Sequence, residues 1–193
     1  MVDSAEEQVK RTFEQWLPTA DFEAIVQHAL AAATTQLTNQ TALPPRLTII
    51  HLEEKQIHLT TAPVRIGVDR HQYMAAVGKA LGERGYWLLG LVLVTEAWLK
   101  RFDDPAAAQR HLQGSRPVRD YEDKQEAVIA AGLTIDNRSQ LIQQRIDRDA
   151  HGHLLLDAPA PLSGARSMIL ESAFAGYREA LQTQMTAGTE PGG

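Results

Sequence analysis

The chain has 193 residues, 44% of them hydrophobic and 22% charged, and a net charge of −5. These proportions are typical of a folded globular domain, and the acidic balance disfavours nucleic acid and anionic membrane as partners. Cysteine is absent, which excludes disulfides, thiolate metal sites and cysteine nucleophiles.

The N-terminal residues MVDSAEEQVKRTF are acidic and polar, unlike a secretory signal peptide. The longest apolar segment, residues 86–99, contains Glu96 and is shorter than the ~20 residues that a membrane helix needs. We therefore expect a cytoplasmic, soluble protein that does not enter the membrane.

Two amphipathic helices are predicted at the start of the chain. Residues 3–17 place apolar side chains at helical spacing and stop at Pro18, which cannot continue a helix interior. Asp21 is predicted to cap a second helix, which ends near Asn39. Its apolar stripe consists of Phe22, Ile25, Val26, Ala29, Leu30, Ala33 and Leu37. We expect residues 1–40 to form a helical hairpin.

A β-hairpin, a helix and a long strand are predicted next. Strands near residues 46–52 and 56–61 flank the polar turn Glu53-Glu54-Lys55, and a helix over residues 69–84 is capped by Asp69 and ended by Gly85. Residues 86–98 are apolar on both alternating faces, which favours a central strand covered on both sides. The expected faces are Trp87, Leu89, Leu91 and Leu93 on one side and Leu88, Val92 and Val94 on the other.

The second half of the chain is predicted to be mostly strands joined by short turns. Residues 100–125 form a polar connection with a short helix near residues 106–112, and strands follow near 126–135, 139–147 and 153–157. From Ser163 onward a closing helix is expected, with Leu170, Phe174, Tyr177 and Leu181 on its apolar face, before a disordered tail over residues 188–193. Because these turns are too short for parallel crossovers, the fold class is α+β with a mainly antiparallel sheet of five or six strands, in a single domain over residues 1–187.

The stretch DRDAHGHLLLD, residues 147–157, has the density of acidic and histidine residues that a metal site requires. As a calcium loop it fails, because His151 stands where an oxygen ligand is needed and Ala158 replaces the bidentate glutamate. As a zinc site it would need Asp147, Asp149, His151 and His153 on one face, but the turn at Ala150-His151-Gly152 breaks that alternation. We interpret the stretch as a hairpin tip and predict no bound metal and no cofactor.

Candidate catalytic residues are His51, His58 and Glu96. The two histidines flank the predicted turn and could face each other, either as a metal or acid–base pair with Glu53 nearby or as ordinary polar residues on a solvated face. Glu96 ends an otherwise apolar strand, so its carboxylate must be paired, protonated or at the rim of the sheet. It could serve as a general acid or stand in an ordinary surface pair.

Candidate ligand-binding residues are Trp98, His71 and Arg101. Trp98 and Arg101 lie close to Glu96 in the sequence, and His71 stands in the first turn of a predicted helix, where free N–H groups can hold an anion. Each also has a simpler interpretation as rim packing or an exposed polar residue.

The compact catalytic motifs of hydrolases, nucleotide-binding proteins and zinc proteases are absent from the sequence. The leading hypothesis is therefore a non-enzymatic protein-interaction or regulatory module, which binds another protein or a second copy of itself. The alternative is an enzyme or small-ligand-binding domain whose acid/base site forms where Glu96, Trp98 and His51 or His58 converge.

Overall fold

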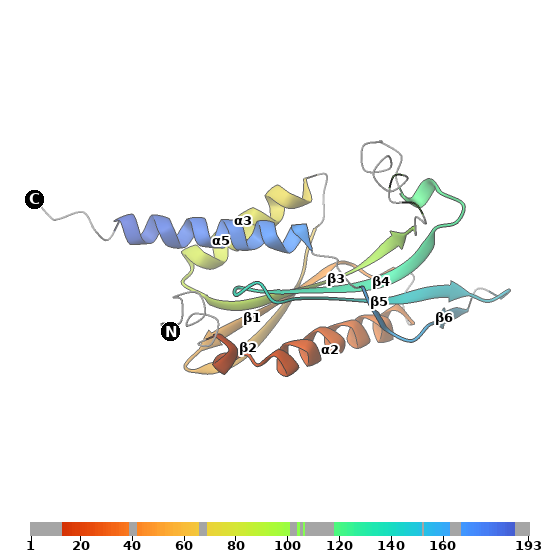
Figure 1. Cartoon of the computed structure of the whole chain (residues 1–193), viewed down its shortest axis with the longest axis horizontal. Coiled ribbons are helices and arrows are strands. Elements are labelled where there is room, and N and C mark those ends of the chain that lie inside the picture. Colours follow the sequence, from red (N-terminus) through yellow and green to blue (C-terminus); the bar gives the residue numbers. More distant parts are fainter. Residues whose placement is uncertain are drawn as a thin grey trace, which may run out of the picture.

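The computed structural model describes residues 13–38, 42–65, 69–100, 104, 106, 118–151, 153–162 and 167–187. These residues form an antiparallel sheet of seven strands, in the order β2-β1-β3-β4-β5-β6, with β7 paired to β5 (Figure 1). The strands are β1 (Arg46–Glu53), β2 (Gln56–Pro63), β3 (Trp87–Leu99), β4 (Gln125–Thr134), β5 (Ser139–Arg148), β6 (Leu154–Leu156) and β7 (Ala160–Pro161). Three α-helices lie entirely within the described residues: α2 (Thr19–Leu37), α3 (Arg70–Glu83) and α5 (Met168–Ala187). A short 3-10 turn, η1 (Val118–Asp120), precedes β4.

The predicted α+β class with a mainly antiparallel sheet is confirmed. Each predicted strand lies within two residues of its observed bounds, and only β7 was not expected. The N-cap of α3 is Asp69 as predicted, because its side chain accepts a hydrogen bond from the Gln72 N–H. Gly85 follows this helix with a φ of 73°, a conformation that favours glycine.

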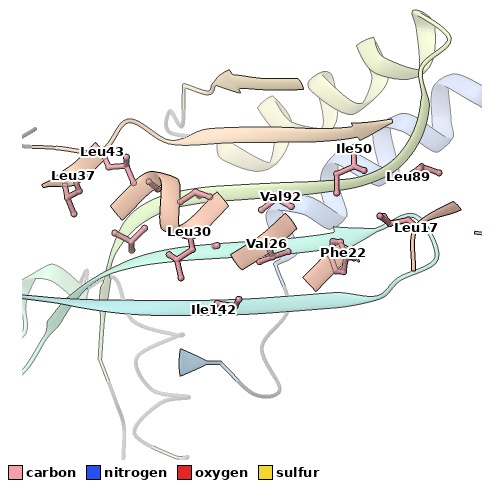
Figure 2. Close-up of a cluster of buried hydrophobic side chains, with 14 of the residues drawn as sticks. Leu17, Phe22, Val26, Leu30, Leu37, Leu43, Ile50, Leu89, Val92 and Ile142 are labelled. Carbon is pink, nitrogen blue, oxygen red and sulfur yellow. The ribbon is translucent and has the colours of Figure 1, made fainter. Parts of the chain in front are cut away.

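Helices cover the two faces of the sheet unequally. We name the faces after the long helices that pack on them: α2 lies on the α2 face, where Phe13 and Trp16 of the preceding helical turn also pack, whereas α3 and α5 lie together on the α3–α5 face (Figure 1). Phe22, Val26 and Leu30 of α2 meet strand residues such as Val92 and Ile142 in the cluster of Figure 2. The other face has its own cluster, built around Met74, Leu91 and Phe174.

The central strand β3 is buried on both faces as predicted, but two of its residues exchange sides. Ile50 of β1 pairs with Gly90 while the next residue, His51, pairs with Leu88, so Leu89 is an extra residue in β3. This β-bulge turns Leu88 toward the α3–α5 face and Leu89 toward the α2 face. The predicted grouping of Leu89 with Leu91, and of Leu88 with Val92, is therefore wrong.

The start of α2 also differs from the prediction. The helix begins at Thr19 directly after Pro18, and Asp21 lies within its first turn, so Asp21 is not the capping residue. Its carboxylate still lies at the helix end where negative charge is favourable. Of the helix expected over residues 3–17, residues 13–16 are helical. Residues 1–12 and 39–40 of the proposed helical hairpin lie outside the described residues.

Three other predictions fall on residues that the structure does not describe. They are the candidate ligand residue Arg101, nearly all of the short helix expected near residues 106–112, and the tail over residues 188–193. None of the helices within the described ranges is long and apolar enough to cross a membrane.

Helices α3 and α5 approach each other through glycines. A Cβ atom added to Gly78 of α3 would lie 1.7 Å from the Ala173 carbonyl oxygen, and one added to Gly176 of α5 would lie 2.0 Å from the Ala75 carbonyl oxygen. The two backbones are therefore in direct contact, and this contact holds the pair as one layer over the sheet.

We expect Gly78→Ala to destabilise the fold by about 1–3 kcal/mol, because the methyl group forces the two helices apart. Helix propensity alone would instead raise the free energy of unfolding, by up to ~1 kcal/mol, because alanine favours the helix more than glycine does. Urea unfolding followed by circular dichroism measures the difference. The control Ala76→Gly, at an exposed position of the same helix, should lose about 1 kcal/mol through propensity alone, and a stabilised Gly78→Ala protein would contradict the packing argument.

Candidate functional site

His51 and His58 face each other across the β1–β2 hairpin. Their Cα atoms are direct partners in the antiparallel register, and their rings stack with centroids 5.7 Å apart and an interplanar angle of 25°. Residues on opposite sides of a hairpin turn share a face when the register is regular. The turn itself is tight, with Glu54 and Lys55 at positive φ, and this fixes the pairing that the sequence left open.

The side chain of His51 is buried at 5% exposure on the α3–α5 face. Its ring contacts the Tyr86 ring edge-on at a centroid distance of 4.9 Å, and its Nε2 lies 3.3 Å from the Thr60 hydroxyl. Burial lowers the pKa of His51 below its ordinary value; Glu53 partly offsets this and the neighbouring His58 adds to it. His51 is therefore neutral near pH 7, and a shallow polar pocket of about 300 Å³ opens beside it.

A metal shared by His51, His58 and Glu53 has no support in this geometry. Within the described ranges, no group of three or more histidine, aspartate or glutamate side chains is close enough to hold a metal ion. His58, unlike His51, is exposed to solvent. The chemistry of the two histidines is that of a partly buried imidazole pair rather than of a metal centre.

Glu96 lies on the opposite face of the sheet from the histidines. It follows Val94 of the α2-face cluster by two residues, and its Oε1 accepts a hydrogen bond from the Leu43 N–H at 2.6 Å. Along β3 it is eight positions from Leu88, the partner of His51, which corresponds to roughly 25 Å at ~3.3 Å per residue. The structure therefore does not bring Glu96 together with His51 or His58, and Glu96 holds the segment before β1 against the end of β3.

The other two described candidates are far from this pair as well. Trp98 is 43% exposed on β3, with the Lys124 ammonium 5.0 Å from the centre of its ring. His71 lies in the first turn of α3, where its Nδ1 is 2.9 Å from the Ser172 hydroxyl of α5. His71 thus links two helices.

The histidine-rich stretch at residues 147–153 is a hairpin tip, as predicted. The pairing of β5 with β6 ends at Arg148 and Leu154, and Asp149 closes the turn between the two strands. Its Oδ1 accepts hydrogen bonds from the N–H groups of His151 and His153, and its Oδ2 lies 2.9 Å from His153 Nδ1. The density of polar residues therefore serves the turn.

Sequence reasoning missed a cleft between α2 and the β1–β2 hairpin. It has a volume of about 540 Å³ and is lined by Ala24, Ile25, His28, Ala29, Ala32, Ala33, Arg46, Thr48, Leu59, Thr61 and Val94. The only signal of this cleft in the sequence is the run of alanines in α2, because their small side chains leave the space beside that face of the helix unfilled. A second cleft of about 630 Å³ lies on the other flank of α2, against β5 and β7.

Comparison with known proteins gives no functional lead, because no family model, no curated protein and no solved structure matches the chain. The site must be interpreted from its own geometry.

Because His51 binds fewer protons in the folded than in the unfolded chain, its contribution to stability is lost as pH falls through its ordinary pKa of 6.5. We expect the free energy of unfolding to fall between about pH 7.5 and pH 5.5, and His51→Gln to flatten this slope. Urea unfolding at a series of pH values measures it. His58→Gln, at the exposed partner, should change the slope less; equal slopes in the wild type and His51→Gln would refute the assignment.

Proposed function

We propose that this domain is a protein-interaction module that forms a homodimer through its β2 edge, and that it is not an enzyme. The observation that carries the proposal is the contrast between the two edges of the same sheet. One edge is long, regular and uncharged, whereas the other is short and interrupted. A sheet edge that lacks protection is a template for pairing with another chain.

Strand β2 has the properties of a pairing edge. It is eight residues long, QIHLTTAP, carries no charged side chain and pairs with β1 without a bulge. Only its last residue, Pro63, lacks an N–H donor. Ile57 and Leu59, 37% and 51% exposed, project from it on the α2 face, so backbone donors and acceptors lie beside exposed apolar side chains.

The opposite edge is protected in the ways that natural sheets use. Its strands β6 and β7 are three and two residues long, and β7 ends with Pro161. Head-to-tail addition of β2 to this edge would give open chains, whereas two β2 strands related by a two-fold axis form a closed pair. The contrast favours a closed dimer over a polymer.

The local charges at the two ends of β2 fit a second copy. Each copy carries a net charge of −5, so two copies repel each other overall, and a contact strand without charged side chains, such as β2, adds no local repulsion to this. In an antiparallel two-fold pairing, the β2 start of one copy lies at the β2 end of the other. That arrangement brings the Glu53-Glu54 turn of one copy near Arg65 of its partner, an attractive pairing.

The alternative of a dispersed acid/base enzyme has less support, because Glu96 and the two histidines lie on opposite faces of the sheet. A general acid and base must both reach one substrate. The Thr60 hydroxyl lies 3.3 Å from His51 Nε2, but among the described residues no third histidine or acidic side chain joins the pair to form a metal-binding group.

We expect the wild-type protein to have a mass in solution of twice the 21.3 kDa of one chain, and Ile57→Lys to be a monomer. A lysine on an edge strand opposes strand pairing, because its charge must be desolvated in the new sheet. Light scattering after size-exclusion chromatography measures the mass. Hydrogen exchange should show that the β2 amides pointing away from β1 become exposed to exchange in the variant.

The matched control is Leu155→Lys, which makes the same change on β6 at the opposite edge, where the side chain is 53% exposed. This variant should remain a dimer. A monomeric wild type at every concentration, or a dimer unaffected by Ile57→Lys, would overturn the proposal.

A further inference from the structure

The cleft between α2 and the β1–β2 hairpin exists because α2 covers only part of its face. The helix packs on β3, β4 and β5, which leaves the α2-facing side chains of β1 and β2 beside it rather than beneath it. Phe22 and Val26 fill the space over Gly132 of β4, where a Cβ atom would clash with both. Toward β1 and β2 the helix presents alanines instead, and the space of about 540 Å³ remains open.

The walls of this cleft are apolar except at Arg46 and His28. Alanines and Ile25 of α2 face Val94 and Leu59 of the sheet. The hydroxyls of Thr48 and Thr61 lie in the floor, 2.9 Å from each other, so they satisfy one another. The described residues that line the cleft include no aspartate or glutamate.

Arg46 brings a guanidinium group to the cleft. Its side chain is half-buried at the start of β1, and it forms no hydrogen bond or ion pair with any residue in the described ranges. A partly desolvated guanidinium without an anion is costly, and its planar donors match a carboxylate. The nearest carboxylate on this face of β3, Glu96, accepts a hydrogen bond from the Leu43 N–H and does not pair with Arg46.

We propose that this cleft binds a small organic carboxylate with an apolar body, such as a medium-chain fatty acid, with Arg46 as the counter-ion. The volume falls within the ~300–1,000 Å³ of small-molecule sites. His28, on α2 at the cleft wall, adds a second hydrogen-bond donor. The apolar body of the ligand replaces water against the alanines and Val94, and its carboxylate satisfies the guanidinium.

The second cleft beside α2 does not share this chemistry. Its described lining consists of amide, hydroxyl, proline and apolar side chains, Gln27, Leu30, Ala31, Thr34, Thr35, Gln140, Ile142, Gln144, Pro159 and Pro161. Because it holds no cation, it has no preference for an anionic ligand. Ala31 and Ala32 are neighbours on α2 that line different clefts, and this gives a matched pair of substitutions.

The test is titration of the full chain with decanoate below its micellar concentration, followed by calorimetry and by amide NMR shifts, with decylamine as the probe of opposite charge. We expect decanoate to bind at one site per chain and to shift the amides of α2 and β1. Arg46→Met should weaken binding roughly tenfold or more, while Arg46→Lys retains part of it. Decylamine should bind more weakly than decanoate, since Arg46 repels it.

Two further variants separate this cleft from other apolar surfaces. Ala32→Phe fills the cleft and should abolish binding, whereas Ala31→Phe fills the second cleft and should leave it unchanged. Equal binding of decanoate and decylamine, no loss in Arg46→Met, or a greater loss in Ala31→Phe than in Ala32→Phe would each overturn the proposal. Ile57→Lys should still bind decanoate, so a failure of the dimer would not be mistaken for a failure of the cleft.

Discussion

The burial of β3 on both of its faces is the constraint on which the rest of the structure depends. Leu91 and Leu93 point to one face while Val92 and Val94 point to the other, and all four are nearly inaccessible to solvent. A strand of this kind cannot lie at an edge or face water, so it must have a neighbour on each side and helices above and below. At the bulge, Leu89 points to the α2 face and Leu88 to the α3–α5 face, the reverse of what regular alternation from Leu91 would give, so each cluster still receives one leucine there.

The two layers of helices meet this constraint in different ways. On one face, α3 and α5 contact each other through Gly78 and Gly176, and the Tyr177 hydroxyl donates a hydrogen bond to the carbonyl oxygen of Tyr86, the residue just before β3. On the other face α2, the one long helix there among the described residues, must cover a sheet that is wider than the helix, because a helix is only ~10–12 Å across and strands are ~4.8 Å apart. The clefts on both flanks of α2 follow from this difference in width.

Local patterns predicted the elements of this fold well, because strand alternation, the N-cap at Asp69 and the turn chemistry around Asp149 act over a few residues. The position of β1 between β2 and β3, and the bulge at Leu89, depend on pairing between distant segments, which no local pattern encodes. The same distinction between local patterns and long-range pairing applies to the candidate site. The facing of His51 and His58 follows from a short turn and could be anticipated, whereas the separation of Glu96 from them depends on the register between β1 and β3. The cleft beside Arg46 left only the run of alanines in α2 as a local signal, because the cleft forms where α2 does not cover the sheet.

The β1–β2 hairpin takes part both in the proposed dimer contact and in the proposed ligand cleft, and strand geometry explains why the two need not compete. Backbone N–H and C=O groups of a strand point along the plane of the sheet, while its side chains stand perpendicular to that plane. Pairing of β2 with a second copy would therefore use groups that point away from β1, whereas a ligand on the α2 face would contact side chains such as Thr48 and Leu59. Of the cleft residues, only Leu59 and Thr61 belong to β2, so the two contacts meet at these side chains alone. Since the carboxylate would be held at Arg46, on the neighbouring strand, the charge of the ligand would stay off the uncharged edge on which pairing depends.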